Sequence, residues 1–533
     1  MNRIGLHKKQ LYTFISLCTL FVLFIIGRVI GEVGVAYLTV SLLLFLLLFS
    51  LFGSAFARSL SELLVYRKER EQYRNMQQMK LCASWLQLCA GVLFGMFLFI
   101  GAKFLATNLL GISSMALLFR LIAALLPLRL LTVLYEGYFY AENLEVHSLV
   151  IKMGRLVLTL GLTGLLIGPM GEYGARVSEL LNQKYVKALY LVAAVLVAIV
   201  AAEVFSLIAY ALVYYKKISS KRMPVKSGMR LTDSKVQCLR LLFQKRISGI
   251  MERMLILLPL FLAFLYWNTH SSKVDGIVIY GVYIGQFCLL TVTVAYLLYL
   301  GSRGLLDKVE EHLTKKEGRH ARFVFHLGIH HCLCVGIYAT VYFTVMAKHI
   351  ASVFSIGGTN VLENMLKNCS FILLLACLFM YLYGFMREHT LQKEAMFSLG
   401  IGSVIYILGM IVLCLVKRPV LFAPVFLALV CLSISCGFMW FLTFRHLRMH
   451  LDWMRAFVVP LGAGCAVGLV GMLFAKLFTP HLGVFFTLIM TTIVTILLYW
   501  MLLMLLQNFS KKDLMLIPTG KALKLISRIF HLF

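Results

Sequence analysis

Charged side chains that interrupt or border long apolar stretches are the residues of this chain best suited to chemistry. They are Arg58, Arg120, Arg129, Arg155, Arg253 and Lys367 among the cations, and Glu136, Glu203 and Glu252 among the acids. A charge inside the hydrocarbon region is costly, so each of these residues is a candidate for ligand binding or ion transfer. Most of the cations are arginines, whose planar guanidinium can hold two phosphate oxygens at once. The pattern favours capture of a phosphorylated, anionic ligand.

Helical rise gives each charge an approximate depth. Arg129 lies about 24 Å from the outer end of its expected span, and Arg155 about 12 Å from the inner end of the next. Glu203 has a depth similar to that of Arg155, and Glu136 shares a helix face with Arg129. Arg120 lies in the outer half of the span, on the opposite face. Two interpretations stay open for these residues: a cationic binding site, or plain ion pairs such as Arg129–Glu136 and Arg155–Glu203.

The elements that must position these charges are membrane-spanning helices. The chain has 533 residues, of which 61% are hydrophobic and 14% charged, and its mean hydropathy is +0.90. Soluble domains are less apolar and more highly charged. We therefore expect an all-α polytopic membrane protein with about fourteen transmembrane helices. The expected spans are 10–27, 35–57, 81–107, 113–140, 147–168, 187–214, 249–267, 276–300, 323–347, 361–386, 394–416, 419–444, 456–478 and 483–507.

The distribution of Lys and Arg predicts the orientation. The formal net charge is +29, and most of the excess falls in alternate loops, which is the positive-inside pattern. This places both termini in the cytoplasm. It also explains the positive charge without a nucleic-acid partner. The apolar stretch after the basic start lacks a small-x-small cleavage site, so we expect an uncleaved first span.

A basic stretch after the sixth span suggests two halves. We expect an N-terminal lobe over 1–215, a cytoplasmic linker over 216–247 and a C-terminal lobe over 248–444, followed by two further helices over 445–507 and a tail over 508–533. A short internal repeat between 52–71 and 300–319 agrees with two related lobes. The tail segment 519–533 has a basic and an apolar face, so it would lie on the membrane or on the protein itself.

Catalytic and metal-binding constellations are not expected. His330, His331 and Cys334 have no zinc spacing, and the 13 cysteines contain no C-x-x-C pair. The Gly-rich segment 168–174 lacks the lysine of a P-loop. We expect no cofactor, no metal and no enzymatic activity.

Several motifs, in order along the chain, resemble a known group of membrane proteins. They are IGEVGVAYL (30–38), FGSAFARSLSELL (52–64), EGYFYAEN (136–143), IKMGRLVLTLG (151–161) and KKDLMLIPTGKAL (511–523). They are similar to motifs of the polysaccharide-exporter and stage V sporulation protein B-like branch of the multidrug/oligosaccharidyl-lipid/polysaccharide flippase superfamily. The sequence departs from that pattern at Glu136, where the branch commonly has Arg, and in its second lobe.

The resemblance implies two six-helix lobes and an added helix pair, working by alternating access. It implies a flippase that moves a polyprenyl-diphosphate-linked oligosaccharide or cell-wall precursor from the inner to the outer leaflet of a bacterial cell membrane. Arg58, Arg129 and Arg155 would hold the diphosphate, with Arg120 and Arg253 as further substrate-binding candidates. Glu203, Glu136 and Glu252 would serve ion coupling or cavity ion pairs. Membrane lipids, and a polysaccharide polymerase or glycosyltransferases, are the expected partners of a monomer.

Other classes remain as alternatives. An ion-coupled multidrug or cation exporter of the same superfamily would place acids rather than arginines deep in its cavity. A major-facilitator carrier should show a G-x-x-x-D-R/K-like loop between spans two and three, which RKEREQYRNMQQMK does not. A membrane glycosyltransferase or polymerase would need acids in its first outer loop or a long outer domain. A scaffold without transport activity stays open.

Overall fold

The structure is a computed structural model. In the part of the chain that it describes, the regular secondary structure is helical. The structure describes residues 3–183, 185–219, 233–271, 273–356, 359–388, 391–415, 420, 422–447, 452–510, 513 and 516–517. Eleven helices in these ranges are long and apolar enough to cross a membrane, and a helix pair bent by 60° makes a twelfth. The all-α polytopic fold is confirmed, and the chain is a multi-pass membrane protein.

The chain forms two compact units, Met1–Gly281 and Val282–Phe533. The helices of the first unit are α1 (Arg3–Gly53), α2 (Phe56–Glu69), α3 (Tyr73–Phe104), α4 (Ala116–Ala141), α5 (Glu145–Leu181), α6 (Tyr185–Tyr214), α7 (Lys235–His270) and α8 (Lys273–Gly281), with short turns η1 (Leu105–Leu110), η2 (Ser113–Met115) and η3 (Tyr215–Ser219).

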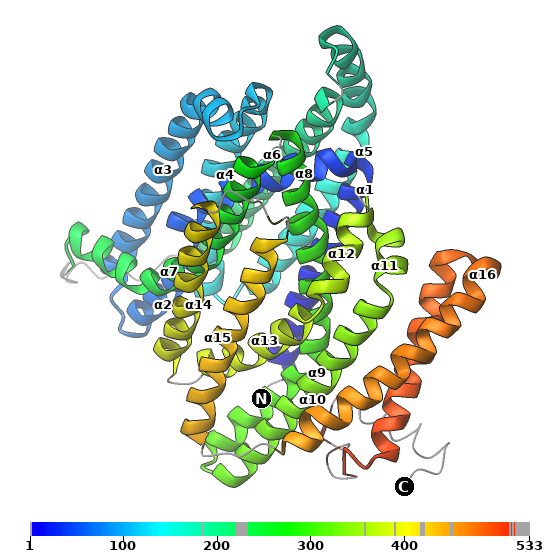
Figure 1. Ribbon diagram of the computed structural model, residues 1–533. Helices are drawn as coiled ribbons and strands as arrows, with labels where there is room; N and C mark the ends of the chain where they lie inside the picture. The colour runs from blue at the N-terminus through cyan, green and yellow to red at the C-terminus, as the bar shows by residue number, and fades with distance from the viewer. Residues whose placement is uncertain are drawn as a thin grey trace. The chain divides into compact units, whose positions relative to one another are not determined.

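The helices of the second unit complete the list. They are η4 (Val282–Cys288), α9 (Leu289–Thr314), α10 (Gly318–Val345), α11 (Ala347–Phe354), α12 (Thr359–Cys369), α13 (Ile372–Glu388), α14 (Gln392–Leu415), α15 (Ala423–Leu447), η5 (Met454–Val458) and α16 (Val459–Leu505). Figure 1 labels the longer elements of both units.

Two of the long helices each contain two spans. At about 1.5 Å per residue, the 51 residues of α1 are far longer than a bilayer is thick. The backbone of α1 leaves helical geometry at Gly31, with φ 75° and ψ 177°, and that of α16 does so at Gly483, with φ 72° and ψ 164°. This region of backbone space is essentially restricted to glycine. The turn at Gly483 folds α16 into a hairpin, drawn in orange to red (Figure 1). Counting each of these two helices as two spans and the bent pair as one gives the fourteen expected.

The boundary between the units differs from the expected one. The linker was expected to run to 247, but α7 begins at Lys235 and packs on α1, α2 and α3. Its start is a capping box: the Ser234 hydroxyl accepts from the Gln237 amide nitrogen, and the Gln237 side chain accepts from the Ser234 amide nitrogen. Because α7 and α8 pack on the first unit, the boundary falls after Gly281 rather than before 248. Residues 220–232 of the predicted linker and the tail segment 519–533 lie outside the described residues.

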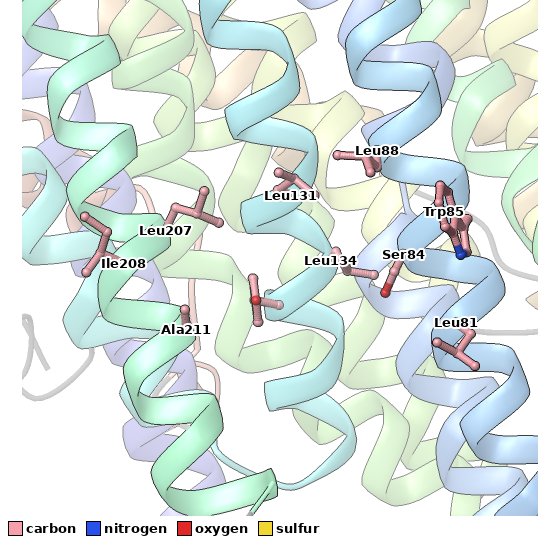
Figure 2. A pocket seen from close by; sticks show the side chains of 10 residues that line it. Leu81, Ser84, Trp85, Leu88, Leu131, Leu134, Leu207, Ile208 and Ala211 are labelled. Carbon is pink, nitrogen blue, oxygen red and sulfur yellow. The ribbon is translucent and has the colours of Figure 1, made fainter.

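Helices α3 and α4 meet through small residues. A Cβ atom at Gly91 would lie 2.8 Å from Pro127 Cα, and one at Gly95 would lie 3.0 Å from the Ala123 carbonyl oxygen. Such close backbone approach is how helices associate where lipid removes the hydrophobic driving force. Beside this contact, α3, α4 and α6 form an open, largely apolar groove of about 500 Å³. We call it the α3/α4/α6 groove; Figure 2 shows Trp85, Leu131 and Ile208 on its walls.

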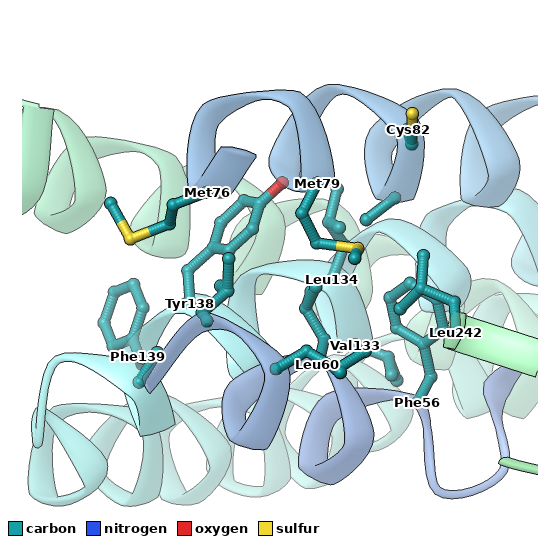
Figure 3. Packing of buried hydrophobic residues seen from close by; sticks show 14 of the residues in the cluster. Phe56, Leu60, Met76, Met79, Cys82, Val133, Leu134, Tyr138, Phe139 and Leu242 are labelled. Carbon is teal, nitrogen blue, oxygen red and sulfur yellow. The ribbon is translucent and has the colours of Figure 1, made fainter. Parts of the chain in front are cut away.

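A buried cluster fixes the other end of α4. Phe56 and Leu60 of α2, Met79 of α3, Tyr138 of α4 and Leu242 of α7 belong to it (Figure 3). The Tyr138 hydroxyl lies 3.0 Å from Ser84 Oγ and donates to the Lys80 carbonyl oxygen at 3.2 Å. The helix α4 is thus held against α2, α3 and α7 where its last turns carry Glu136.

Candidate functional site

Three helices bring together the deepest charges of the first unit. On α4, two helical turns separate Arg129 from Glu136, and Arg129 Nη1 lies 3.3 Å from Glu136 Oε1. The same nitrogen lies 3.2 Å from Oε1 of Glu203 on α6. The predicted pairing of Arg129 with Glu136 is therefore present, and Glu203 joins it from the neighbouring helix.

Helix α5 supplies two more cations. Arg155 Nη1 lies 2.9 Å from Glu203 Oε2, as the matched depths of these two residues predicted. Lys152 Nζ lies 2.9 Å from Glu136 Oε2. Each carboxylate therefore bridges two cations, and each of its oxygens faces a different one.

A threonine completes this group. Thr132 Oγ1 lies 2.6 Å from Glu203 Oε1 and 2.9 Å from the carbonyl oxygen of Arg129, and it accepts from Arg129 Nη1 at 3.2 Å. We call Arg129, Thr132, Glu136, Lys152, Arg155 and Glu203 the charge network. Lys152 was not among the predicted site residues. The spacing in the sequence indicates it, because Lys152 and Arg155 are three residues apart and share a helix face.

Burial divides the charge network by sign. The side chains of Glu203 and Glu136 are 3% and 7% exposed, whereas those of Arg129, Arg155 and Lys152 are 21%, 23% and 16% exposed. Three cations stand against two carboxylates, so the formal charge of the group is +1. Both ion pairs that the sequence left open, Arg129–Glu136 and Arg155–Glu203, are present. Part of each cation nevertheless stays accessible while its acid is enclosed.

Aromatic rings frame the cations. The Arg129 guanidinium lies 5.9 Å from the ring centroid of Phe49 on α1. Lys152 Nζ lies 5.6 Å from the Tyr140 ring centroid and donates to the Tyr140 hydroxyl at 3.0 Å. A hydrogen bond of 2.8 Å between Ser148 Oγ and Tyr210 Oη ties α5 to α6 nearby. Ring faces favour a cation beside them, and these contacts hold the cations in place without neutralising them.

The remaining predicted site residues lie elsewhere. Arg58 is 71% exposed and pairs with Glu62 of its own helix at 3.2 Å. Arg120 is exposed and lies 5.6 Å from the Phe99 ring centroid, nine residues before Arg129 on α4. On α7, Arg253 is exposed and Glu252 is partly buried. In the described part of the chain, Arg58 and Arg120 contact Glu62 and Phe99, which lie outside the charge network.

A buried arginine on α7 escaped the sequence analysis because it fell in the expected linker. The side chain of Arg246 is fully buried and donates through Nη2 to the carbonyl oxygens of Leu51, at 3.0 Å, and Phe52. Its guanidinium lies 5.0 Å from the Phe56 ring centroid. It joins α7 to the C-terminal end of α1, where carbonyl groups attract a cation.

The two adjacent histidines of the second unit are hydrogen-bonded within the helical core. His331 Nδ1 lies 2.8 Å from Ser302 Oγ, and His330 Nε2 lies 3.0 Å from the Arg455 carbonyl oxygen. Across the described part of the chain, no three His, Cys, Asp or Glu side chains gather in a way that could hold a metal ion.

Comparison with known proteins gives a likeness in structure alone. No protein-family model matches the sequence, and no curated protein matches it. The inward-facing form of a multidrug resistance transporter of the MATE family, in the MOP superfamily, aligns with a TM-score of 0.64 at 12% identity, covering 81% of this chain and 95% of that one. The lipid II flippase MurJ, in an inward closed conformation, aligns with a TM-score of 0.60 at 12% identity over 92% of this chain and 98% of that one.

A third solved structure is a MOP superfamily transporter from Pyrococcus furiosus, whose binding pocket is described as reversed in polarity. It aligns with a TM-score of 0.53 at 12% identity and covers 83% of this chain and 94% of that one. At such low identity the likeness is one of fold. The chain has the fold of the multidrug/oligosaccharidyl-lipid/polysaccharide transporters, as its motifs implied.

Proposed function

We propose that this chain is a flippase that moves a polyprenyl-diphosphate-linked oligosaccharide or cell-wall precursor from the inner to the outer leaflet by alternating access. The observation that carries the proposal is the charge network, a positive group of side chains built into three membrane helices. The chain shares its fold with the lipid II flippase MurJ and with multidrug transporters. A membrane protein keeps buried charges where a function requires them.

An anionic headgroup suits the charge network better than a cation does. The carboxylates of Glu136 and Glu203 are enclosed and each is already bridged by two cations. The accessible faces belong to Arg129, Arg155 and Lys152, so an incoming ligand meets donors. Since the acids hold the arginine side chains in place, binding of a phosphate costs little side-chain ordering. An ion-coupled exporter of cations, the second candidate, would need one of these acids to be released from its partners.

The cellular setting follows from the same proposal. The protein would lie in a bacterial cell membrane with both termini in the cytoplasm, act as a monomer, and deliver its cargo to a polymerase or glycosyltransferases. We propose that Arg129 and Arg155 bind the diphosphate, with Lys152 replacing Arg58 as the third cation. Arg120 and Arg253 would then have no role in headgroup binding.

Native mass spectrometry of the detergent-purified protein tests the proposal, with undecaprenyl diphosphate, a neutral lipid and a cationic dye offered together. We expect selective retention of the diphosphate lipid, weakened about tenfold or more by Arg155→Gln, since a charged hydrogen bond contributes about 1.5–3 kcal/mol. The double variant Arg155→Gln/Glu203→Gln replaces an ion pair by two neutral amides and controls for misfolding. Arg176→Gln is the matched control, because Arg176 is exposed on the same helix, about 32 Å further along it.

Two results would overturn the proposal. One is retention of the dye with indifference to the diphosphate, which would favour the exporter. The other is normal transport by both Arg129→Ala and Arg155→Ala in cells, with the protein correctly inserted.

A further inference from the structure

A second groove lies beside the charge network. Helices α1 and α5 of the first unit form it, with a volume of about 340 Å³ and an apolar lining. We call it the α1/α5 groove; its lining residues are Leu17, Cys18, Phe21, Val22, Met153, Leu156, Val157 and Leu160. Phe21 and Val157 are 65% and 66% exposed, so the groove opens at the surface of the unit.

On α5, the groove and the cations occupy adjacent helix faces. With 3.6 residues per turn, Leu156 is about 40° from Lys152 around the helix axis. Lys152 lies at the end of the groove nearer the start of α5, and Arg155 is about 100° from Leu156 around the same helix. From there the α5 wall, 153–160, continues for about 10 Å along the helix. A molecule with an anionic head at these cations could therefore run its apolar chain directly into the groove.

Helix α1 reaches the charge network from the other wall. Tyr12, five residues before the groove residue Leu17, is hydrogen-bonded to Tyr140. The Tyr140 hydroxyl is the group that accepts from Lys152 Nζ. Two tyrosines and a lysine thus link the start of α1 to the charge network, and the same two helices line the groove.

We propose that the α1/α5 groove holds the first isoprene units of the substrate's polyprenyl chain while Lys152 and Arg155 hold its phosphate. The proposal rests on the proposed function and names the part of the lipid that the protein itself contacts. Charge complementarity at one end and an apolar lining along the rest match an amphiphile with a single chain. The occupant is this chain rather than an acyl chain of the surrounding bilayer, because a zwitterionic headgroup gains less from two accessible cations.

The α3/α4/α6 groove provides a matched comparison. It is larger and also largely apolar, and Leu131 and Leu134 of α4 line it (Figure 2), as does Tyr135 of the same helix. On that helix Thr132 and Glu136 follow Leu131 and Tyr135 directly, yet the cations Lys152 and Arg155 belong to α5, which contributes no residue to this groove. An ordinary lipid site should not distinguish the two grooves, whereas a substrate site should.

The experiment measures retention of dimethylallyl, geranyl and farnesyl diphosphate, which have one, two and three isoprene units, by the full-length purified protein. Farnesyl diphosphate has ten more carbons than dimethylallyl diphosphate. If these carbons pack in the groove, farnesyl diphosphate should bind about tenfold more tightly, even though its chain is transferred from a detergent micelle and not from water. Val157→Trp, which fills the α1/α5 groove, should abolish this gain, so that the three-unit compound binds no more tightly than the one-unit compound. Ile208→Trp, a change of the same kind at a 53% exposed position of the other groove, should retain the gain.

Each part of the proposal has its own readout. If Val157→Trp keeps the chain-length gain, or if Ile208→Trp loses it as well, the α1/α5 groove is not the chain site. Phe21→Ala repeats the test by enlarging the groove, and it should reduce the gain in binding from one to three isoprene units. Competition by a zwitterionic phospholipid at equal concentration would identify the occupant as bilayer lipid and overturn the proposal. Failure of the proposed function appears separately, as unchanged binding of dimethylallyl diphosphate to Arg155→Gln.

Discussion

Arg155 and Glu203 form an ion pair between α5 and α6 in which only the cation is accessible. Nη1 lies 2.9 Å from Oε2, with the arginine side chain 23% exposed and the glutamate side chain 3% exposed. The second oxygen of Glu203 is occupied by Arg129 and Thr132. The carboxylate therefore works as an anchor that directs two guanidinium groups toward the accessible side.

Removing this anchor should cost more than removing one of the groups it holds. Glu203→Gln leaves two arginines short of a partner, and we expect a loss of about 3 kcal/mol of stability, as for a broken buried ion pair. Arg155→Gln should cost less, because Glu203 keeps Arg129 and Thr132. Thermal unfolding of both single variants and of the double variant gives the coupling energy. Additive effects of the two substitutions would show that the pair is not coupled.

The hydroxyl of Thr132 is a separate test of the same anchor. Thr132→Val keeps the shape of the side chain and removes the donor to Glu203, which should lower the free energy of unfolding by about 1–2 kcal/mol. Thr132→Ser keeps the hydroxyl and should restore most of that loss. Both are compared by thermal unfolding in the same detergent. Equal stability of the Val and Ser variants would mean that the hydrogen bond contributes nothing.

The membrane fold was accessible from sequence because its signals are local. Apolar stretches of bilayer length predicted the spans, and Gly31 and Gly483 are where α1 and α16 each divide into two spans. The pairing of Arg155 with Glu203 also followed from sequence, since rise per residue converts position into depth. The capping box at Ser234 was present in the sequence too, and it defines a start of α7 earlier than hydropathy suggests.

Other parts of the site depend on which helices become neighbours, and hydropathy does not encode that. Lys152 falls near the start of the expected span 147–168 and was not among the predicted site residues, yet from α5 it pairs with Glu136 of α4. Arg58 looked like a buried charge, but α2 is a separate helix after the left-handed residue Ala55, and it presents Arg58 at the surface. Arg246 looked like one more linker cation and is buried between α7 and the end of α1.

Arg246 should stabilise the junction between α7 and α1. Arg246→Met keeps an unbranched apolar stem but removes the donor to the carbonyl oxygens of Leu51 and Phe52. We expect a loss of about 1–3 kcal/mol, because polar groups in the interior are left without a partner. Arg240→Met, at an exposed position of the same helix, should have little effect. A more stable Arg246→Met protein would show instead that the cost of burying the charge exceeds what its hydrogen bonds return.

The close contact of α3 with α4 sets the position of Arg129, which follows Pro127 by two residues. Gly91→Ala would place a Cβ atom 2.8 Å from Pro127 Cα, in backbone that cannot yield easily. We expect a loss of about 1–3 kcal/mol, as for overpacking, and weaker retention of the diphosphate lipid. Gly101→Ala on the same helix meets nothing within 4 Å and should be neutral or stabilising. Equal melting temperatures for the two variants would contradict the tight α3–α4 contact.

The hairpin in α16 depends on one backbone conformation. Gly483 has φ 72° and ψ 164°, and a Cβ atom there would meet nothing within 4 Å, so any cost of Gly483→Ala comes from the backbone alone. That cost should be about 1–3 kcal/mol. Gly462→Ala, within the same helix and equally free of contacts, has ordinary helical geometry and should stabilise the protein by about 0.5–1 kcal/mol. The two variants carry the same added methyl group, so opposite shifts in melting temperature isolate the turn. If Gly483→Ala were as stable as Gly462→Ala, the two helices would have to continue across residue 483 without the turn.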